Sequence, residues 1–242
     1  MHHVVLEQWS RRSSVLHRRD PRAKILALLV FLIVVATTHQ ALPQLSTVLL
    51  AVLAAACLWA RIPLIAALRR AALVLPFTAV FALVCWMAGD PGRGLTLALK
   101  SYLSALAVLL VMATTPVPAL LAALESLYVP GFLLMVTQFL YRYLFVISEE
   151  AQHMSKAAAC RAGRTRALIS LRRFQAAAGA LAVLFARAQG RAEDIHRAML
   201  ARGFRGNFKT LATRPFTADD ALFLTAACSL VLLARFGVEG FR

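Results

Sequence analysis

Two short motifs in this chain combine an arginine with alanine and glycine at the end of a long helical pattern. The first is Ala159-Cys160-Arg161-Ala162-Gly163 and the second is Ala201-Arg202-Gly203. The arginine side chain is planar and carries five N–H donors, so it can enter an acidic groove on another protein. Glycine ends a helix in the left-handed conformation, and alanine lets a partner's surface approach the backbone. Ordinary C-terminal caps, with arginine near the negative end of the helix dipole, are the alternative interpretation.

The chain carries none of the sequence motifs of the common enzymes. It lacks a G-x-x-x-x-G-K-[ST] phosphate loop, an H-E-x-x-H zinc motif and a G-x-S-x-G nucleophile elbow. Carboxylate pairs such as Glu149/Glu150 and Glu193/Asp194 are neighbours in sequence, so on a helix they point about 100° apart and suit acid–base catalysis poorly. We therefore expect a chain that is not an enzyme, binds no ATP and holds no cofactor.

Metal binding has little support in the sequence. The four cysteines, Cys57, Cys85, Cys160 and Cys228, show no CxxC spacing, and no cluster of histidine and cysteine resembles a metal site. We predict no metal site in this chain. One question stays open at Met1-His2-His3, where an amine, two amide nitrogens and a third-position imidazole could wrap Cu(II) or Ni(II).

The composition is that of a membrane protein. Of the 242 residues, 60% are hydrophobic, and the mean hydropathy is +0.71. Soluble domains have only about 45–50% apolar residues, and here the excess is gathered into long runs. The net charge of +16 comes from 27 Lys and Arg against 11 Asp and Glu. Nucleic-acid-binding proteins have such a charge, but membrane proteins acquire it because their cytoplasmic segments accumulate lysine and arginine.

The first 114 residues contain four predicted spans. Residues 1–24 are basic and lack the apolar region of a cleavable signal peptide, so we expect a cytoplasmic N-terminus followed by an uncleaved first span. Turns containing proline, glycine or arginine separate the apolar runs, which cover about 25–42, 45–60, 71–88 and 95–114. Four crossings return the chain to the cytoplasm.

The apolar run from Gly131 to Ile147 is not assigned as a further span. A crossing there would place residues 148–214, with 13 Lys and Arg, on the outside, against the positive-inside rule. A polar stripe also runs along this helix and makes it amphipathic; it consists of Gln138, Arg142, Glu149, Gln152 and Lys156. We predict one helix over about 131–160, with its first half at the inner leaflet and its second half in the cytoplasm.

A second long helix follows, in which apolar residues recur at alternating spacings of three and four. The pattern predicts about 30 residues of helix with a buried seam of period 3.5. The seam consists of Leu171, Phe174, Ala178, Leu181, Phe185, Ala188, Ala192, Ile195 and Met199. Gly179 weakens this helix by about 1 kcal/mol relative to alanine. A close crossing of another helix would justify Gly179, and chance tolerance is the alternative.

A last span is predicted over about 218–236, where Thr217 caps the helix and Asp219 and Asp220 occupy its first turn. The predicted fold class is an all-α integral membrane protein with about five transmembrane helices and two long cytoplasmic helices inserted before the last span. The corresponding parts of the chain are residues 1–114 (N-terminal segment and four spans), 115–214 (cytoplasmic helices) and 215–242 (last span).

This organisation favours docking over simple capping at the arginine motifs. Each motif ends a long cytoplasmic helix in a membrane protein that has no ATPase of its own. The candidate docking residues are Ala159, Arg161, Ala162, Gly163, Ala201, Arg202 and Gly203.

Five segments of the chain occur in the order typical of one transporter family: His17-Arg18-Arg19-Asp20-Pro21-Arg22-Ala23-Lys24, Thr114-Thr115-Pro116, Leu124-Glu125-Ser126-Leu127-Tyr128-Val129-Pro130, Tyr141-Arg142-Tyr143 and Ala198-Met199-Leu200-Ala201-Arg202-Gly203-Phe204. Over about residues 17–210 the chain resembles the transmembrane T component of energy-coupling factor (ECF) transporters, and most of all the cobalt/nickel group of CbiQ-like proteins. It departs from the family at Cys160, where alanine is usual. Either Cys160-Arg161-Ala162 or Ala162-Gly163-Arg164 therefore takes the first docking position.

The resemblance implies a coupling subunit that spans the bacterial inner membrane several times. Its two long cytoplasmic helices would cross as an X, with the arginine motifs seated in two ATP-binding cassette ATPase subunits that bind the ATP. A separate CbiM-like membrane S component, with or without a small CbiN-like subunit, would bind the substrate. ATPase motion transmitted through this chain would then drive import of cobalt or nickel ions, as cobalamin biosynthesis requires.

Two other assignments fit the sequence. The first is the T component of a vitamin importer, of the biotin type or of the shared-module type. The more remote one is a membrane-anchored nucleic-acid-binding protein that uses the basic stretch 156–214. That stretch offers few aromatic residues for stacking on bases, namely Phe174, Phe185, Phe204 and Phe208, and the first two belong to the seam. We therefore expect a lipid bilayer and protein partners, with no nucleic acid.

Overall fold

The computed structural model describes residues 9, 14, 16–38, 42–161, 171–206 and 216–239 of the chain. Over these residues the secondary structure is helical, with turns and no strand, so the all-α prediction is confirmed. The chain forms two compact units, one made of Met1–Leu127 with Ala212–Arg242 and the other of Tyr128–Leu211.

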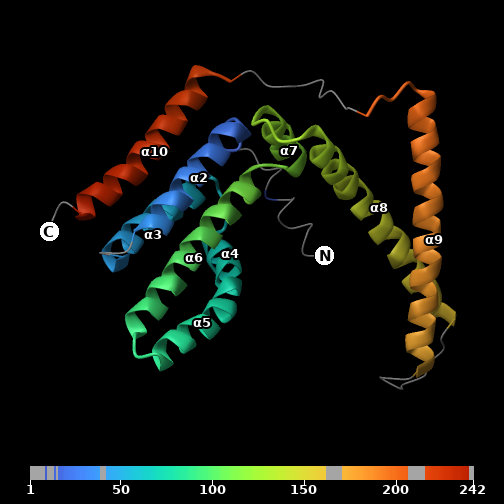
Figure 1. The fold of residues 1–242 in the computed structure, drawn as a ribbon, viewed down its shortest axis with the longest axis horizontal. Coiled ribbons are helices and arrows are strands. Elements are labelled where there is room, and N and C mark those ends of the chain that lie inside the picture. Colours follow the sequence, from blue (N-terminus) through green and yellow to red (C-terminus); the bar gives the residue numbers. More distant parts are fainter. Residues whose placement is uncertain are drawn as a thin grey trace. The chain divides into compact units, whose positions relative to one another are not determined.

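The first unit is a bundle of helices (Figure 1). Its elements are α2 (Pro21–Thr37), α3 (Leu42–Trp59), α4 (Leu64–Ala71), the 3-10 turn η1 (Ala72–Val74), α5 (Leu75–Met87), α6 (Pro91–Thr114), α7 (Val117–Ser126) and α10 (Ala218–Glu239).

Aspartate followed by proline begins two helices of this bundle. The Asp20 side chain accepts a hydrogen bond from the backbone N–H of Arg22, and Asp90 does the same for Arg93. The proline after each aspartate has no N–H and its φ already suits the first helical turn. These Asp-Pro pairs fix where α2 and α6 start.

Four of the described helical stretches are long and apolar enough to cross a membrane: Leu64–Met87, Gly92–Thr114, Gly131–Arg161 and Ala218–Gly237. The first of them runs through α4, η1 and α5, so it starts seven residues before the predicted third span at about 71–88. The apolar stretch Gln44–Trp59 of α3 is shorter. The 17 residues of α2 extend about 26 Å, slightly less than the roughly 30 Å hydrocarbon core.

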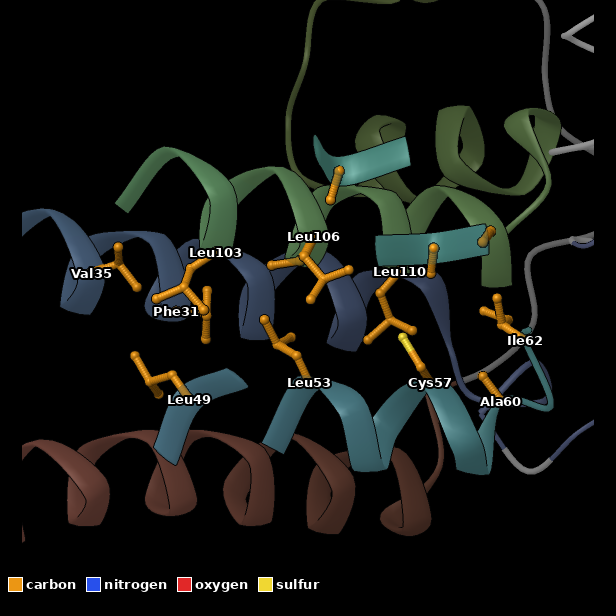
Figure 2. Packing of buried hydrophobic residues seen from close by; sticks show 14 of the residues in the cluster. Phe31, Val35, Leu49, Leu53, Cys57, Ala60, Ile62, Leu103, Leu106 and Leu110 are labelled. Atoms are coloured by element: carbon orange, nitrogen blue, oxygen red, sulfur yellow. The ribbon is translucent and has the colours of Figure 1, made fainter. Parts of the chain in front are cut away.

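The core of the first unit lies between α2, α3 and α6 (Figure 2). Phe31 and Val35 of α2 face Leu49 and Leu53 of α3, and α6 contributes residues such as Leu106. Small residues complete this core and let the backbones approach; they are Cys57, Ala60, Ala67, Ala71 and Ala113. The α10 helix packs against α2 and α3. In a bilayer such helices associate mainly through van der Waals packing, which the small residues favour because they let the backbones approach.

Gly94 allows α5 and α6 to approach closely. A Cβ atom at this position would lie 2.9 Å from the backbone oxygen of Ala82 and 3.1 Å from its Cα. Only a residue without a side chain fits there without moving the backbone of α5. Gly94, in the first turn of α6, thus supplies the contact that pairs the two helices.

The second unit consists of α8 (Gly131–Arg161) and α9 (Leu171–Ala201). Both long helices expected near 131–160 and 171–199 are present, and each has 31 residues, or about 46 Å of length. The chain reverses direction between them (Figure 1). They meet near the middle of both helices, where Val146 and Ile147 of α8 lie by Leu184 and Ala188 of α9.

The expectation of a continuous buried seam on α9 is wrong within this chain. Leu181 is 65% exposed and Phe185 is 74% exposed. The face toward α8 contains Leu184, which is not a seam residue, and Ala188, which is one, and the seam is longer than the short crossing can cover. A Cβ atom at Gly179 would meet no described atom within 4 Å, so no close helix crossing in the described part of this chain accounts for that glycine.

Candidate functional site

The second arginine motif forms a complete helix C-terminus at the end of α9. The N–H of Phe204 donates to the carbonyl of Met199 at 3.0 Å, and the N–H of Gly203 donates to Leu200 at 2.9 Å. Gly203 has a φ of +79°, so the predicted left-handed glycine is confirmed and the pair of bonds is a Schellman motif. Arg202 lies at the turn itself and is exposed. The motif therefore presents its guanidinium on a rigid helix end.

The first arginine motif is described only in part. Arg161 is the last described residue of α8, and both it and Ala159 are exposed. Ala162 and Gly163 lie outside the described residues, as does Arg164. The alternative between Cys160-Arg161-Ala162 and Ala162-Gly163-Arg164 as docking position therefore stays a prediction.

The two arginine motifs lie at opposite ends of the second unit (Figure 1). Each follows the crossing at the C-terminal end of its own helix, and the helices run in opposite directions. At 1.5 Å per residue, Arg161 is about 17 Å from Glu150 at the crossing, and Arg202 is about 22 Å from Arg187. Among the described residues, no carboxylate forms an ion pair with either motif arginine. Both arginines are exposed at the ends of their helices.

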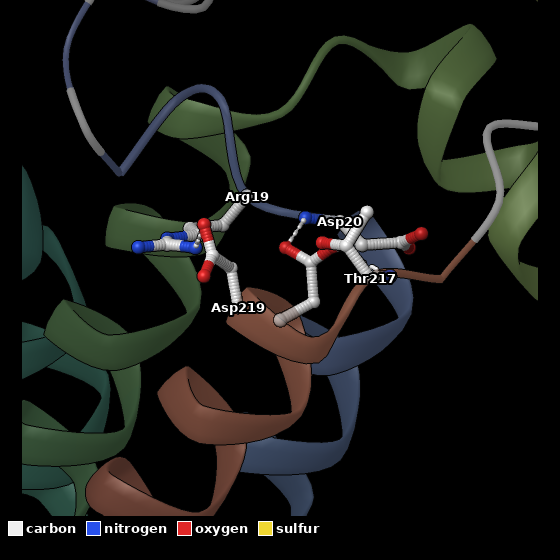
Figure 3. A network of polar contacts seen from close by, with 5 residues as sticks. Arg19, Asp20, Thr217 and Asp219 are labelled. Carbon is white, nitrogen blue, oxygen red and sulfur yellow. Dashed lines mark hydrogen bonds and ion pairs between the residues drawn. The ribbon is translucent and has the colours of Figure 1, made fainter.

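A polar cluster joins three helix ends of the first unit. One oxygen of the Asp220 carboxylate accepts the N–H of Asp20 at 3.0 Å, and the other accepts the N–H and hydroxyl of Thr217 at 3.2 and 2.5 Å. Arg19 forms an ion pair with Asp219 at 3.4 Å. Figure 3 shows these groups between the starts of α2 and α10. Thr217 directly precedes α10 as predicted, but its hydroxyl donates to the Asp220 carboxylate, so the contact is an acidic side chain that caps the N–H of Thr217.

Lys24 connects the same cluster to the end of α6. Its ammonium donates to the carbonyl of Thr114 at 3.1 Å and to the hydroxyl of Thr115 at 3.2 Å. Lys24 precedes the apolar stretch of α2 and is only 4% exposed. Burial lowers its pKa to about 8, against the opposing attraction of Asp20 and Asp220. The side chain thus acts as a donor to the last carbonyl of α6 and to the hydroxyl of the residue that follows the helix.

Comparison with known protein families covers most of the chain. The family described as CbiQ, cobalt transport protein, matches residues 12–211, which include the polar cluster's N-terminal half and both arginine motifs. The chain belongs to the CbiQ cobalt transport protein family. The resemblance seen in the sequence is thereby confirmed.

Two relatives of this CbiQ-family chain differ in how much they share with it. The cobalt transport protein CbiQ of Rhodobacter capsulatus is 32% identical over 121 residues, which are 50% of this chain and 48% of the relative. The match thus spans about half the length of that protein. The uncharacterized protein MJ1571 of Methanocaldococcus jannaschii is 23% identical over 243 residues, covering 91% of this chain and 82% of the relative.

The polar cluster gives the CbiQ family segments a structural role that the sequence did not indicate. The segments around residues 17–24 and 114–116 are about 90 residues apart, yet Lys24 joins them directly. The hydrogen bond from Asp20 to Asp220 connects residues that are 200 positions apart in the sequence. The sequence offered one signal for this contact, which is that Lys24 directly precedes an apolar run. A lysine that becomes buried at such a place needs hydrogen-bond acceptors.

The described residues of this CbiQ-family chain contain no group of three or more metal-ligating side chains that could hold an ion. Its four cysteines are all unpaired, and Cys57 is fully buried in the core of the first unit.

Proposed function

We propose that this chain is the energy-coupling T component of an ECF-type cobalt or nickel importer. The observation that carries the proposal is the exposure of Arg161 and Arg202 at the C-terminal ends of two crossed helices, in a member of a cobalt transport family. Each motif would seat in an acidic groove of one ATP-binding cassette ATPase. The ATPases would bind and hydrolyse ATP, and this chain would transmit their motion without catalysing a reaction itself.

The proposed partners divide the remaining tasks of import. A CbiM-like membrane S component, with or without a small CbiN-like subunit, would bind the metal ion. The exposed apolar side chains on α9, such as Leu181 and Phe185, support a role for this arm in contacts with other subunits or lipid, because exposed apolar patches commonly mark interaction surfaces.

The proposed orientation places the N-terminus in the cytoplasm of a bacterial cell, with the first unit in the inner membrane. The polar cluster supports it, because the start of α2, the end of α6 and the start of α10 lie at one end of the bundle. At the other end Lys100 donates to the carbonyl of Ala36, and Arg235 donates to the hydroxyl of Thr37. Arg18, Arg19 and Arg22 lie at the first end, as the positive-inside rule requires of a cytoplasmic side.

Reversal of both motif charges tests the docking. In the full chain, co-expressed with the cobalt-type ATPases of the source organism, Arg161→Glu with Arg202→Glu should release the ATPases during affinity purification. Reversing a charge in a groove that fits arginine costs about 2 kcal/mol or more, which lowers capture about thirtyfold or more.

The matched control is Lys156→Glu with Arg197→Glu, which changes the net charge equally at exposed positions of α8 and α9 outside the motifs. This control should retain the ATPases. Full retention by the Arg161→Glu/Arg202→Glu variant would overturn the proposed docking.

A further inference from the structure

The crossing of α8 and α9 contains one ion pair between the two helices. Arg187 of α9 donates to the carboxylate of Glu150 of α8. The other ion pairs among the described residues of this unit, His153–Glu149 and Arg197–Glu193, connect residues four apart on the same helix. The Glu150–Arg187 pair is thus the polar link across the crossing.

The contact around this link is small and mostly apolar. The residues that surround the crossing are Val146, Ile147, Glu150, Leu184, Arg187, Ala188 and Arg191. Such a patch holds two helices together, but aliphatic side chains allow neighbouring registers and crossing angles at similar energies. A directional polar contact favours one register and one crossing angle over the others. A single polar residue in the interface of a coiled coil fixes its register in the same way.

The stability that this pair contributes is small. The Arg187 side chain is 62% exposed and that of Glu150 is 31% exposed, and exposed ion pairs stabilise proteins only weakly. Its geometric effect is larger, because both arginine motifs lie on long arms beyond the crossing. A rotation of about 10° would move an arm end that is about 20 Å from the crossing by roughly 3–4 Å.

We propose that the Glu150–Arg187 ion pair positions the two arms of the second unit and thereby sets the distance between the Arg161 and Arg202 docking ends. Glu150 and Arg187 are positioning residues, which act through the motif arginines. The inference rests on the proposed function, because the distance between the ends matters only if two ATPases must be engaged at once.

Distance measurement in the full chain tests the positioning directly. The native cysteines are first replaced, and spin labels are then attached at Lys156→Cys and His196→Cys. Both positions are exposed and lie outside the motifs, and the distance between the labels reports the separation of the two arms. Glu150→Lys and Arg187→Glu should each broaden and shift the distance distribution. The exchanged pair Glu150→Arg with Arg187→Glu should restore a narrow distribution close to that of the unsubstituted pair.

Two further comparisons make the result specific. Glu193→Lys breaks the ion pair within α9 with the same change of charge, and it should leave the distances unchanged. Capture of the co-expressed ATPases should fall roughly fivefold in Glu150→Lys, the size expected for loss of an exposed ion pair, and recover in the exchanged pair.

An unchanged distance distribution in both single variants would overturn the positioning role, as would failure of the exchanged pair to restore it. Failure of the proposed function has a different signature: the ATPases would stay bound when Arg161 and Arg202 are reversed, whatever the distances show.

Discussion

Asp220 illustrates how one carboxylate can hold two chain segments. It is 1% exposed and accepts hydrogen bonds from Asp20 in the N-terminal segment and from Thr217 before α10. The sequence predicted an acidic first turn and a threonine cap at α10, since both are local rules of helix ends. It could not predict the Asp20 contact, because that pairing depends on how α2 and α10 pack.

Removing the Asp220 carboxylate should destabilise the first unit. Asp220→Ala leaves the buried N–H of Asp20 without an acceptor, which costs about 2–3 kcal/mol. Thermal unfolding of the purified chain in detergent measures the loss as a lower melting temperature.

The neighbouring Asp219→Ala serves as control for this change. Asp219 is 82% exposed and its ion pair with Arg19 lies at the surface, so its removal should change the free energy of unfolding by no more than about 1 kcal/mol. Equal losses in both variants would contradict the role given to Asp220.

At the scale of the elements, periodicity predicted the helices better than their contacts. The spacing of apolar residues on α9 gives its length, because every helix repeats about every 3.6 residues whatever it packs against. It does not show which part of the apolar face a single neighbour covers. Hence Leu184 and Ala188 lie at the crossing with α8, while Leu181 and Phe185 are exposed.

The close approach of α5 and α6 depends on Gly94. Gly94→Ala would place a Cβ atom 2.9 Å from the backbone oxygen of Ala82, so one helix must move. Overpacking of this kind costs about 1–3 kcal/mol, and the melting temperature of the purified chain should fall accordingly.

Gly92→Ala is the matched control on the same helix, because its Cβ would make an ordinary contact at 3.6 Å with the Asp90 side chain. We expect it to leave the melting temperature nearly unchanged. A Gly94→Ala chain as stable as the Gly92→Ala chain would contradict the close packing of α5 and α6.

The whole molecule combines a bundle of helices, most of them apolar, with a unit of two long helices. Composition and positive charge predicted the membrane class, and the order of short motifs predicted the family, which the match over residues 12–211 shows. The number of spans was harder to predict, because α2 is short for a span and α8 has the length and apolar composition of one. Whether α8 crosses the membrane or stays on the cytoplasmic side depends on the charge of the segments that follow it. Length and mean hydropathy do not measure that charge.

The proposed role of the whole molecule is to couple ATP hydrolysis by its partners to metal import. The most direct measurement is ATP-driven uptake of radioactive cobalt ions into proteoliposomes that contain the complete complex. We expect ATP-driven uptake with the unchanged chain and with Lys156→Glu/Arg197→Glu. When Arg161 and Arg202 are both reversed to glutamate, we expect uptake no higher than without ATP. ATP-driven uptake at the unchanged rate in the Arg161→Glu/Arg202→Glu complex would contradict the proposed role.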